Sequence, residues 1–185
     1  MNQEKLTNKA MEALGEAQSL AQSMEHQNIE PLHLLSALLK QDGGVVPALL
    51  SGVKAGCEKA LAAEIESRLA AKPKVKGEGG KYVSRELSQV FIDAEKLSKE
   101  MQDEFVSCEH MFLSMFSGDT GELLQKCGVT ADAAKKALAS VRGASRVTDR
   151  DPEGKYNALE KYGQDLTALA AAGKLDPVID RDEEI

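Results

Sequence analysis

Residues 29–38 read IEPLHLLSAL and residues 106–115 read VSCEHMFLSM, so one pattern of residue types occurs twice in the chain. His33 and His110 set the offset between the two copies at 77 residues. At this offset the match continues on both sides, over more than fifty residues, through the pairs Thr7 and Ser84, Leu14 and Phe91, Met24 and Met101, Asp42 and Asp119, and Leu61 and Leu138. Self-similarity of this length predicts a duplicated structural unit.

The periodicity inside each copy is that of α-helices. After Thr7, apolar residues recur in steps of three and four, which places them on one face of a helix. Thr7, Ser84 and Ser107 are suitable helix caps, and Pro31 suits a first helical position. We expect helices at 7–24, 31–39, 46–50 and 54–69 in the first copy, and after Ser84, at 108–116, around 123–124 and at 131–141 in the second. The predicted fold class is all-α, an eight-helix domain built from two four-helix repeats with pseudo-twofold symmetry.

The composition is typical of a soluble helical protein. The chain has 185 residues with 42% hydrophobic, 29% charged and only 4% aromatic residues and no Trp, which favours a helical core over a β-sandwich. A net charge of −7 argues against nucleic acid or an anionic membrane as partner. The chain shows no signal-peptide pattern and no apolar run of about 20 residues, and we expect a cytoplasmic protein. The cysteines lack CxxC spacing and are expected to be free thiols: Cys57, Cys108 and Cys127.

Two stretches rich in Gly, Pro and charged residues divide the chain. The composition changes after the second stretch, where a short helix at 165–172 is expected to end at Gly173. We expect a repeat domain over 1–142, and the chain is interpreted as a piece of a longer protein. The predicted organisation is repeat one at 1–71, a linker at 72–83, repeat two at 84–142, a flexible linker at 143–155 and the truncated start of a further domain at 156–185.

The C-terminal part carries a family resemblance. It reads YGQDLT at 162–167, GKLDPVI at 173–179 and RDEEI at 181–185. These motifs resemble the entry to the first ATPase domain of ClpB-type AAA+ disaggregases. Upstream, LTNK at 6–9, EAL at 12–14 and the two His-centred helix starts resemble the repeat-built Clp N-terminal domain, so the resemblance covers nearly the whole chain.

The resemblance implies a non-catalytic role for this part of a stress-response chaperone. In that family a mobile N-terminal domain on an ATP-driven homohexameric ring contacts unfolded or aggregated polypeptide and helps to pass it to the central pore. The longer protein would use ATP and Mg²⁺ and can cooperate with the DnaK chaperone system. Val178 and Ile179 match the family's adenine contact, whereas Asp180 stands where the family usually has Gly. The Walker A and Walker B motifs are absent from this chain, so the fragment is expected to hold no cofactor and not to be an ATPase.

Differences between the copies point to candidate functional positions. Asn28 corresponds to Phe105 and Leu32 corresponds to Glu109, so polar and aromatic groups gather near the second His-centred helix. The resemblance implies a role in substrate handling for Thr7, Asp103 and Glu109, and we add Phe105 as a candidate client-binding residue. The alternative is structural, because Thr7 is a helix cap and Glu109 would favour the dipole of a helix start.

Three further alternatives are considered. The domain can be a docking platform for a folded adaptor protein, as in Clp protease-type ATPases. The chain can be an enzyme in its own right, although it shows no Ser/His/Asp set or phosphate-binding loop. His33 and His110 can be metal ligands, but hydrogen-bonded histidines at equivalent helix starts are the expected reading, with no metal site.

Overall fold

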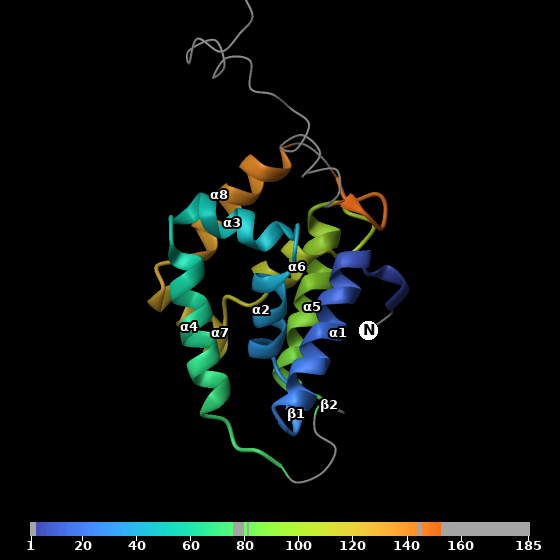
Figure 1. Ribbon diagram of the computed structural model, residues 1–185. Helices are drawn as coiled ribbons and strands as arrows, with labels where there is room; N and C mark the ends of the chain where they lie inside the picture. Colours follow the sequence, from blue (N-terminus) through green and yellow to red (C-terminus); the bar gives the residue numbers. More distant parts are fainter. Residues whose placement is uncertain (1–2, 76–79, 81, 144–145, 153–185) are drawn as a thin grey trace, which may run out of the picture.

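The computed structural model describes residues 3–75, 80, 82–143 and 146–152, and Figure 1 shows them as a helical bundle. None of the helices in these residues is long and apolar enough to cross a membrane. The elements of this part of the chain are one 3₁₀ turn, η1 (Gln3–Lys5), eight α-helices and two short strands. In chain order they are α1 (Asn8–Ser23), β1 (Asn28–Ile29), α2 (Pro31–Lys40), α3 (Val45–Val53), α4 (Cys57–Ala70), β2 (Tyr82–Val83), α5 (Arg85–Glu100), α6 (Cys108–Leu113), α7 (Gly118–Lys126) and α8 (Ala131–Arg142).

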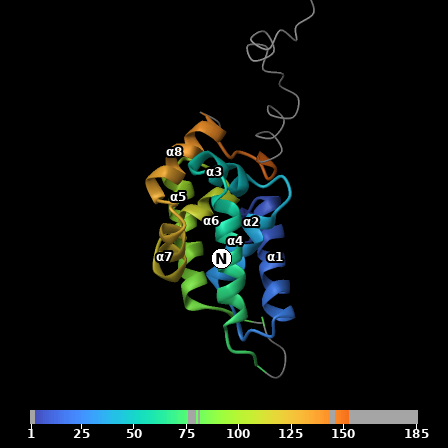
Figure 2. The same ribbon diagram turned by 60° about the vertical axis from the view of Figure 1, so that its left-hand side comes forward.

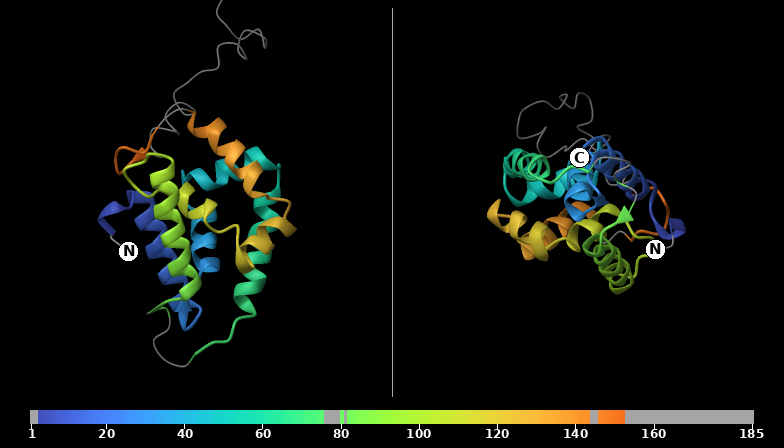
Figure 3. Two further views of the ribbon diagram at one scale, coloured as in Figure 1. Left: turned by 180° about the vertical axis from the view of Figure 1, so that it is seen from behind. Right: turned by 90° about the horizontal axis from the view of Figure 1, so that it is seen from below.

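The duplication predicted from the sequence is confirmed. Helices α1 and α5 each have 16 residues, and both their first and their last residues are 77 positions apart. Helices α2 and α6 also begin 77 residues apart. Figure 2 shows α1–α4 on one side of the molecule and α5–α8 on the other, and the view from below in Figure 3 shows the same two layers.

The helix starts are held by the side chains that the sequence predicted. The Thr7 hydroxyl accepts a hydrogen bond from the Ala10 N–H at 3.2 Å, and the Ser84 hydroxyl accepts one from the Leu87 N–H at 3.1 Å. Each cap satisfies one N–H of the first turn that has no partner inside the helix. The predicted helix at 108–116 is shorter than expected: α6 ends at Leu113, and the Met115 N–H bonds to the carbonyl of Phe112, three residues back, instead of continuing the four-residue pattern.

The two units share one core. Helix α3 of the first unit packs on α8 of the second, and α4 packs on α7. A unit of roughly sixty residues buries only a marginal core by itself, and this exchange of contacts lets both units contribute to a larger one. The largest fully buried side chains come from both units: Leu6, Leu34, Leu35, Leu38, Leu49, Leu50, Leu61, Ile65, Leu69, Leu87, Met111 and Phe112.

Two parallel strand contacts join the units, and the sequence did not predict them. Strand β1 pairs with β2, so that Ile29 lies opposite Val83. Leu6 forms a parallel bridge to Val106, which is the same pair of positions with the two units exchanged. Strand segments of two residues are too short to show the alternation by which strands are recognised in a sequence.

Residues 146–152, within the stretch expected to be a flexible linker, lie against the domain. Val147 is fully buried, and its carbonyl accepts a hydrogen bond from the Glu104 N–H at 2.9 Å. The domain boundaries given above remain a prediction. The expected helix at 165–172 and the residues Val178, Ile179 and Asp180 lie outside the described residues.

Candidate functional site

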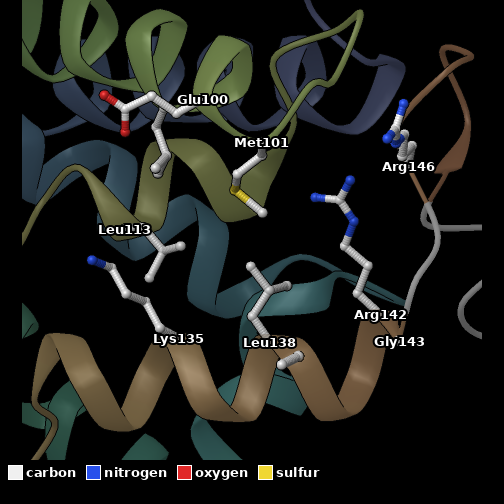
Figure 4. Close-up of a pocket in the computed structure, with 10 residues that line it drawn as sticks. Glu100, Met101, Leu113, Lys135, Leu138, Arg142, Gly143 and Arg146 are labelled. Atoms are coloured by element: carbon white, nitrogen blue, oxygen red, sulfur yellow. The ribbon is translucent and has the colours of Figure 1, made fainter.

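An open groove lies between the end of α5, α6 and α8. It has a volume of about 470 Å³. Its apolar walls come from Leu97 and Met101 at the end of α5, Leu113 of α6 and Leu138 of α8. Figure 4 shows Met101, Leu113 and Leu138 directed toward one another from these three elements. Such a surface offers apolar contact to a ligand rather than a set of reacting groups.

The groove continues along α5. A second depression of about 280 Å³ shares four lining residues with the first and extends to Asp93 and Phe116. The two depressions therefore form one elongated groove. Charged side chains stand around the apolar walls: Asp93, Lys96, Glu100, Lys135, Arg142 and Arg146.

Arg142 connects the groove to a buried polar cluster. Its side chain lines the groove but is only 5% exposed, and its guanidinium donates a hydrogen bond to Oδ1 of Asp103. Nη1 of Arg142 lies 3.9 Å from Oε1 of Glu109, whose side chain is fully buried. Burial raises the pKa of Asp103, but the hydrogen bonds from Arg142 and the Val147 N–H outweigh it and hold that pKa below its ordinary value. Asp103 is therefore an ionised partner of Arg142 at neutral pH.

His110 completes this cluster as a neutral side chain. Its Nδ1 accepts a hydrogen bond from the Ser107 N–H at 3.0 Å, so the ring proton is on Nε2, which donates to Oδ2 of Asp103 at 2.9 Å. Burial lowers the pKa of His110 more than the neighbouring carboxylates Glu109 and Asp103 raise it. The expected hydrogen-bonded histidine at a helix start is confirmed.

The first repeat has a different set at the same positions. Asp103 and Glu109 correspond, at the offset of 77, to His26 and Leu32. Helices α3 and α7 begin only 73 residues apart, and at that offset Arg142 corresponds to Leu69. His26, Leu32 and Leu69 are also buried, with exposed fractions of 3%, 8% and 2%. The fold is therefore compatible with two apolar residues where the second repeat holds a charged pair. A buried charged pair is often no more stabilising than apolar residues of similar size, which makes a role other than stability worth testing.

His26 and His33 form the counterpart of the Asp103–His110 contact. Nδ1 of His33 accepts from the Glu30 N–H at 3.0 Å, and its Nε2 lies 2.8 Å from Nδ1 of His26. Burial, together with the charge of His26 when protonated, lowers the pKa of His33 to about 4. In the part of the chain that the structure describes, no group of three or more His, Cys, Asp or Glu residues is placed to hold a metal ion.

The structure places the four residues expected from the sequence in different settings. Asp103 and Glu109 come together through Arg142 beneath the groove. Thr7 is fully buried at the start of α1, where its N–H donates to the Val106 carbonyl at 3.0 Å. Phe105 is half-buried, with the guanidinium of Arg150 5.8 Å from its ring centroid. None of the four lines the groove itself, and their part in binding remains a prediction.

The residues that line the groove were not identified from the sequence. Leu97, Leu113 and Leu138 are indistinguishable from core positions in a periodic pattern. Arg142 did carry a usable signal, because an arginine stands where the first repeat, at the offset of 73, has Leu69. Its significance depends on Asp103 and Glu109 lying next to it, which the sequence does not show.

Comparison with known proteins identifies the family. The family model described as "Clp repeat (R) N-terminal domain" matches residues 5–127. The "Chaperone protein ClpB" of Bdellovibrio bacteriovorus is 44% identical over 184 residues, covering 97% of this chain and 21% of that protein. The protein of the same name from Clostridium tetani is 40% identical over 192 residues, covering 100% of this chain and 22% of that protein. The chain thus spans about a fifth of the length of these relatives.

Solved structures share the fold. The Hsp104 N-terminal domain from Candida albicans has a TM-score of 0.70 at 20% identity, over 80% of this chain and 99% of that one. The N-domain of ClpV from Vibrio cholerae has a TM-score of 0.62 at 21% identity, over 74% of this chain and 84% of that one. The internal repeat, the eight helices and these matches lead to one conclusion: the chain belongs to the Clp repeat N-terminal domain family and resembles the N-terminal part of ClpB chaperones.

Proposed function

We propose that this domain is the non-catalytic client-binding module of an ATP-dependent chaperone that disaggregates and unfolds proteins. The observation that carries the proposal is the elongated groove with walls of Leu97, Met101, Leu113 and Leu138. Contiguous exposed apolar surface on a soluble domain is typical of interaction sites. An elongated apolar groove suits an extended, unfolded segment, because such a segment can present successive apolar side chains along it.

The binding is expected to be weak and tolerant of sequence. An apolar patch of ~300–600 Å² at ~25 cal/mol/Å² contributes roughly 8–15 kcal/mol before costs. Association and the ordering of a flexible partner oppose this by ~4–15 kcal/mol. The two ranges overlap, so the net free energy of binding is small, and we expect a Kd in the micromolar to millimolar range, which suits a module that must release its client.

The buried residues singled out from the sequence are proposed to act through their neighbours. Asp103 and Glu109 hold Arg142 at the groove, so they are positioning residues for that side chain. Thr7 holds the start of α1 against Val106, and Phe105 lies in the same loop as Asp103. Under this proposal, substitutions at Asp103 or Glu109 change client affinity by displacing Arg142.

The longer protein is proposed to be a homohexameric AAA+ ATPase that uses ATP and Mg²⁺, threads clients through its pore and cooperates with the DnaK system in the cytoplasm. The support is the similarity to proteins named ClpB over the whole of this chain. The adenine contact assigned to Val178 and Ile179 is part of the same proposal. No step of ATP hydrolysis is assigned to the residues described here.

The test is a titration of the ¹⁵N-labelled chain, followed by amide chemical shifts. The titrant is a protein held unfolded by reduction and carbamidomethylation, with its native disulfide-bonded form as control. We expect shifts confined to the unfolded titrant and centred on Leu97, Leu113 and Leu138. Leu97→Gln is expected to weaken binding about fivefold or more through lost apolar contact.

The chain offers a matched control for this variant. Leu20 is the repeat equivalent of Leu97 and is also half-buried, so Leu20→Gln makes the same chemical change away from the groove. Equal effects of the two variants, or no shifts at millimolar titrant, would count against a client groove. Tight stoichiometric binding of one folded protein instead would favour the adaptor-docking alternative.

A further inference from the structure

Residues 146–152, here called the strap, are bound across the domain after α8. The Val147 N–H donates to Oδ1 of Asp103 at 2.8 Å, and the Glu104 N–H donates to the Val147 carbonyl at 2.9 Å. The Val147 side chain is fully buried. The strap is therefore attached to the loop that carries Asp103 by hydrogen bonds in both directions and by apolar packing.

The far part of the strap is bound to the start of the chain. The Asn8 N–H donates to the Arg150 carbonyl at 2.8 Å, and the guanidinium of Arg150 donates to the Glu4 carbonyl at 3.1 Å. The same guanidinium lies 5.8 Å from the centroid of the Phe105 ring, within cation–π distance. Segments at the two ends of the described chain are thus held together next to α1.

The strap begins at the groove. Arg146, its first residue, lines one end of the groove together with Arg142 and Gly143, and its guanidinium donates to Oε1 of Gln102 at 2.6 Å. Oδ1 of Asp103 accepts from both the groove residue Arg142 and the strap residue Val147. Arg146 therefore forms part of the wall at this end (Figure 4), and a ligand that extends beyond the present end of the groove must displace it.

We propose that the strap is an autoinhibitory element of the client groove. When it is attached, Arg146 bounds one end of the groove, and its release lengthens the groove at that end. This inference rests on the proposed client groove. Because coupling between two binding events is reciprocal, strap release raises client affinity by the same factor by which a bound client favours strap release.

Two substitutions are designed to release the strap from the full chain. Val147→Ser removes buried apolar packing, and Arg150→Ala removes the contacts to Glu4 and Phe105. Thr148→Ala is the matched control, because Thr148 lies in the same strap with an exposed side chain. The probe is the reduced, carbamidomethylated protein described above, and affinity is measured by the same amide-shift titration.

Strap attachment is measured independently of client affinity, by amide hydrogen exchange. The amides of Asn8 and Glu104 donate directly to strap carbonyls, so their exchange reports strap opening. The amides of Val75 and Gly80, which donate to carbonyls of Glu25 and His26 far along the chain, serve as references. In the absence of probe, we expect faster exchange at Asn8 and Glu104 in both releasing variants, with unchanged exchange at the references.

The expected result is binding about fivefold tighter in Val147→Ser and Arg150→Ala, no change in Thr148→Ala, and probe-induced exchange at Asn8 and Glu104 in the unsubstituted chain. Unchanged or weaker binding in variants with a released strap overturns the inference while leaving the groove in place. Unchanged exchange in both variants also overturns it, because the strap is then not held by these contacts. Absence of probe binding in every chain overturns the inference and the proposed function together.

Discussion

Arg142 and Glu109 approach to 3.9 Å beneath the groove, at positions where the first repeat carries Leu69 and Leu32. The two repeats share their helix boundaries in α1 and α5, so the apolar version serves as an internal reference for the charged one. The difference affects both members of the pair, and Asp103 in place of His26 adds a second carboxylate. The charged set is therefore expected to matter more for the groove than for the fold.

The first prediction transplants the first-repeat residues into the second. The triple variant Asp103→His, Glu109→Leu, Arg142→Leu is expected to fold with a free energy of unfolding equal to that of the parent or ~1–4 kcal/mol higher. Arg142→Ala alone is expected to cost roughly 3–5 kcal/mol, because it leaves buried carboxylates without their cation. Urea unfolding followed by circular dichroism measures both. A triple variant as unstable as Arg142→Ala would show that the fold requires the charged set.

The second prediction separates the two roles suggested for Thr7. Thr7→Ala and Ser84→Ala each remove one helix cap and are both expected to cost about 1 kcal/mol, whereas Thr7→Ser keeps the hydroxyl and changes little. If Thr7 belongs to the proposed site, client affinity falls only in Thr7→Ala, which loses the hydroxyl there. The bond from the Thr7 N–H to the Val106 carbonyl belongs to the backbone and is kept in this variant. Equal client affinities in the two alanine variants would remove Thr7 from the proposed site.

The third prediction concerns pH. The pKa of His33 is lowered to about 4 in the folded state, so below its ordinary value of 6.5 the unfolded chain binds the proton first. The contribution of neutral His33 is fully present above pH 6.5 and is lost as pH falls toward 4. Between pH 7.5 and 5 the parent should lose about 2 kcal/mol more of its unfolding free energy than His33→Gln. Parallel pH profiles from urea titrations would contradict this.

The fourth prediction compares two glycines in helices. A Cβ on Gly15, midway along α1, meets no atom within 4 Å, and Gly15→Ala is expected to raise the unfolding free energy by about 0.5–1 kcal/mol through helix propensity. A Cβ on Gly121 would lie 2.5 Å from the Phe116 carbonyl carbon, so Gly121→Ala is expected to cost ~1–3 kcal/mol through overpacking. Thermal unfolding of the two variants should shift in opposite directions.

Much of the fold was predictable from local patterns. The caps Thr7 and Ser84 and the helical periodicity each depend on residues within one or two turns of each other, and the repeat offset is found by comparing two stretches of the sequence directly. The structure confirms all three. The paired strands were not predicted, because Ile29 and Val83 come together across 54 positions and have no repeating pattern of their own. The candidate site shows the same division: Asp103 and Glu109 were named from the sequence, whereas the groove residues Leu97, Leu113 and Leu138 were found only in the structure.

The sequence by itself determined the all-α class, the two-repeat organisation and the family resemblance. Periodicity and capping are properties of residues close in sequence, and similarity between two stretches is found by comparing them directly, without their contacts. Only the tertiary structure decided that Asp103 and Glu109 are buried around Arg142, and that Leu97, Leu113 and Leu138 face a common groove. An apolar residue on a helix face gives the same sequence pattern whether a neighbouring helix covers it or it lies at an open groove. The distinction depends on how α5, α6 and α8 pack, and that packing is set by contacts between segments distant in the chain.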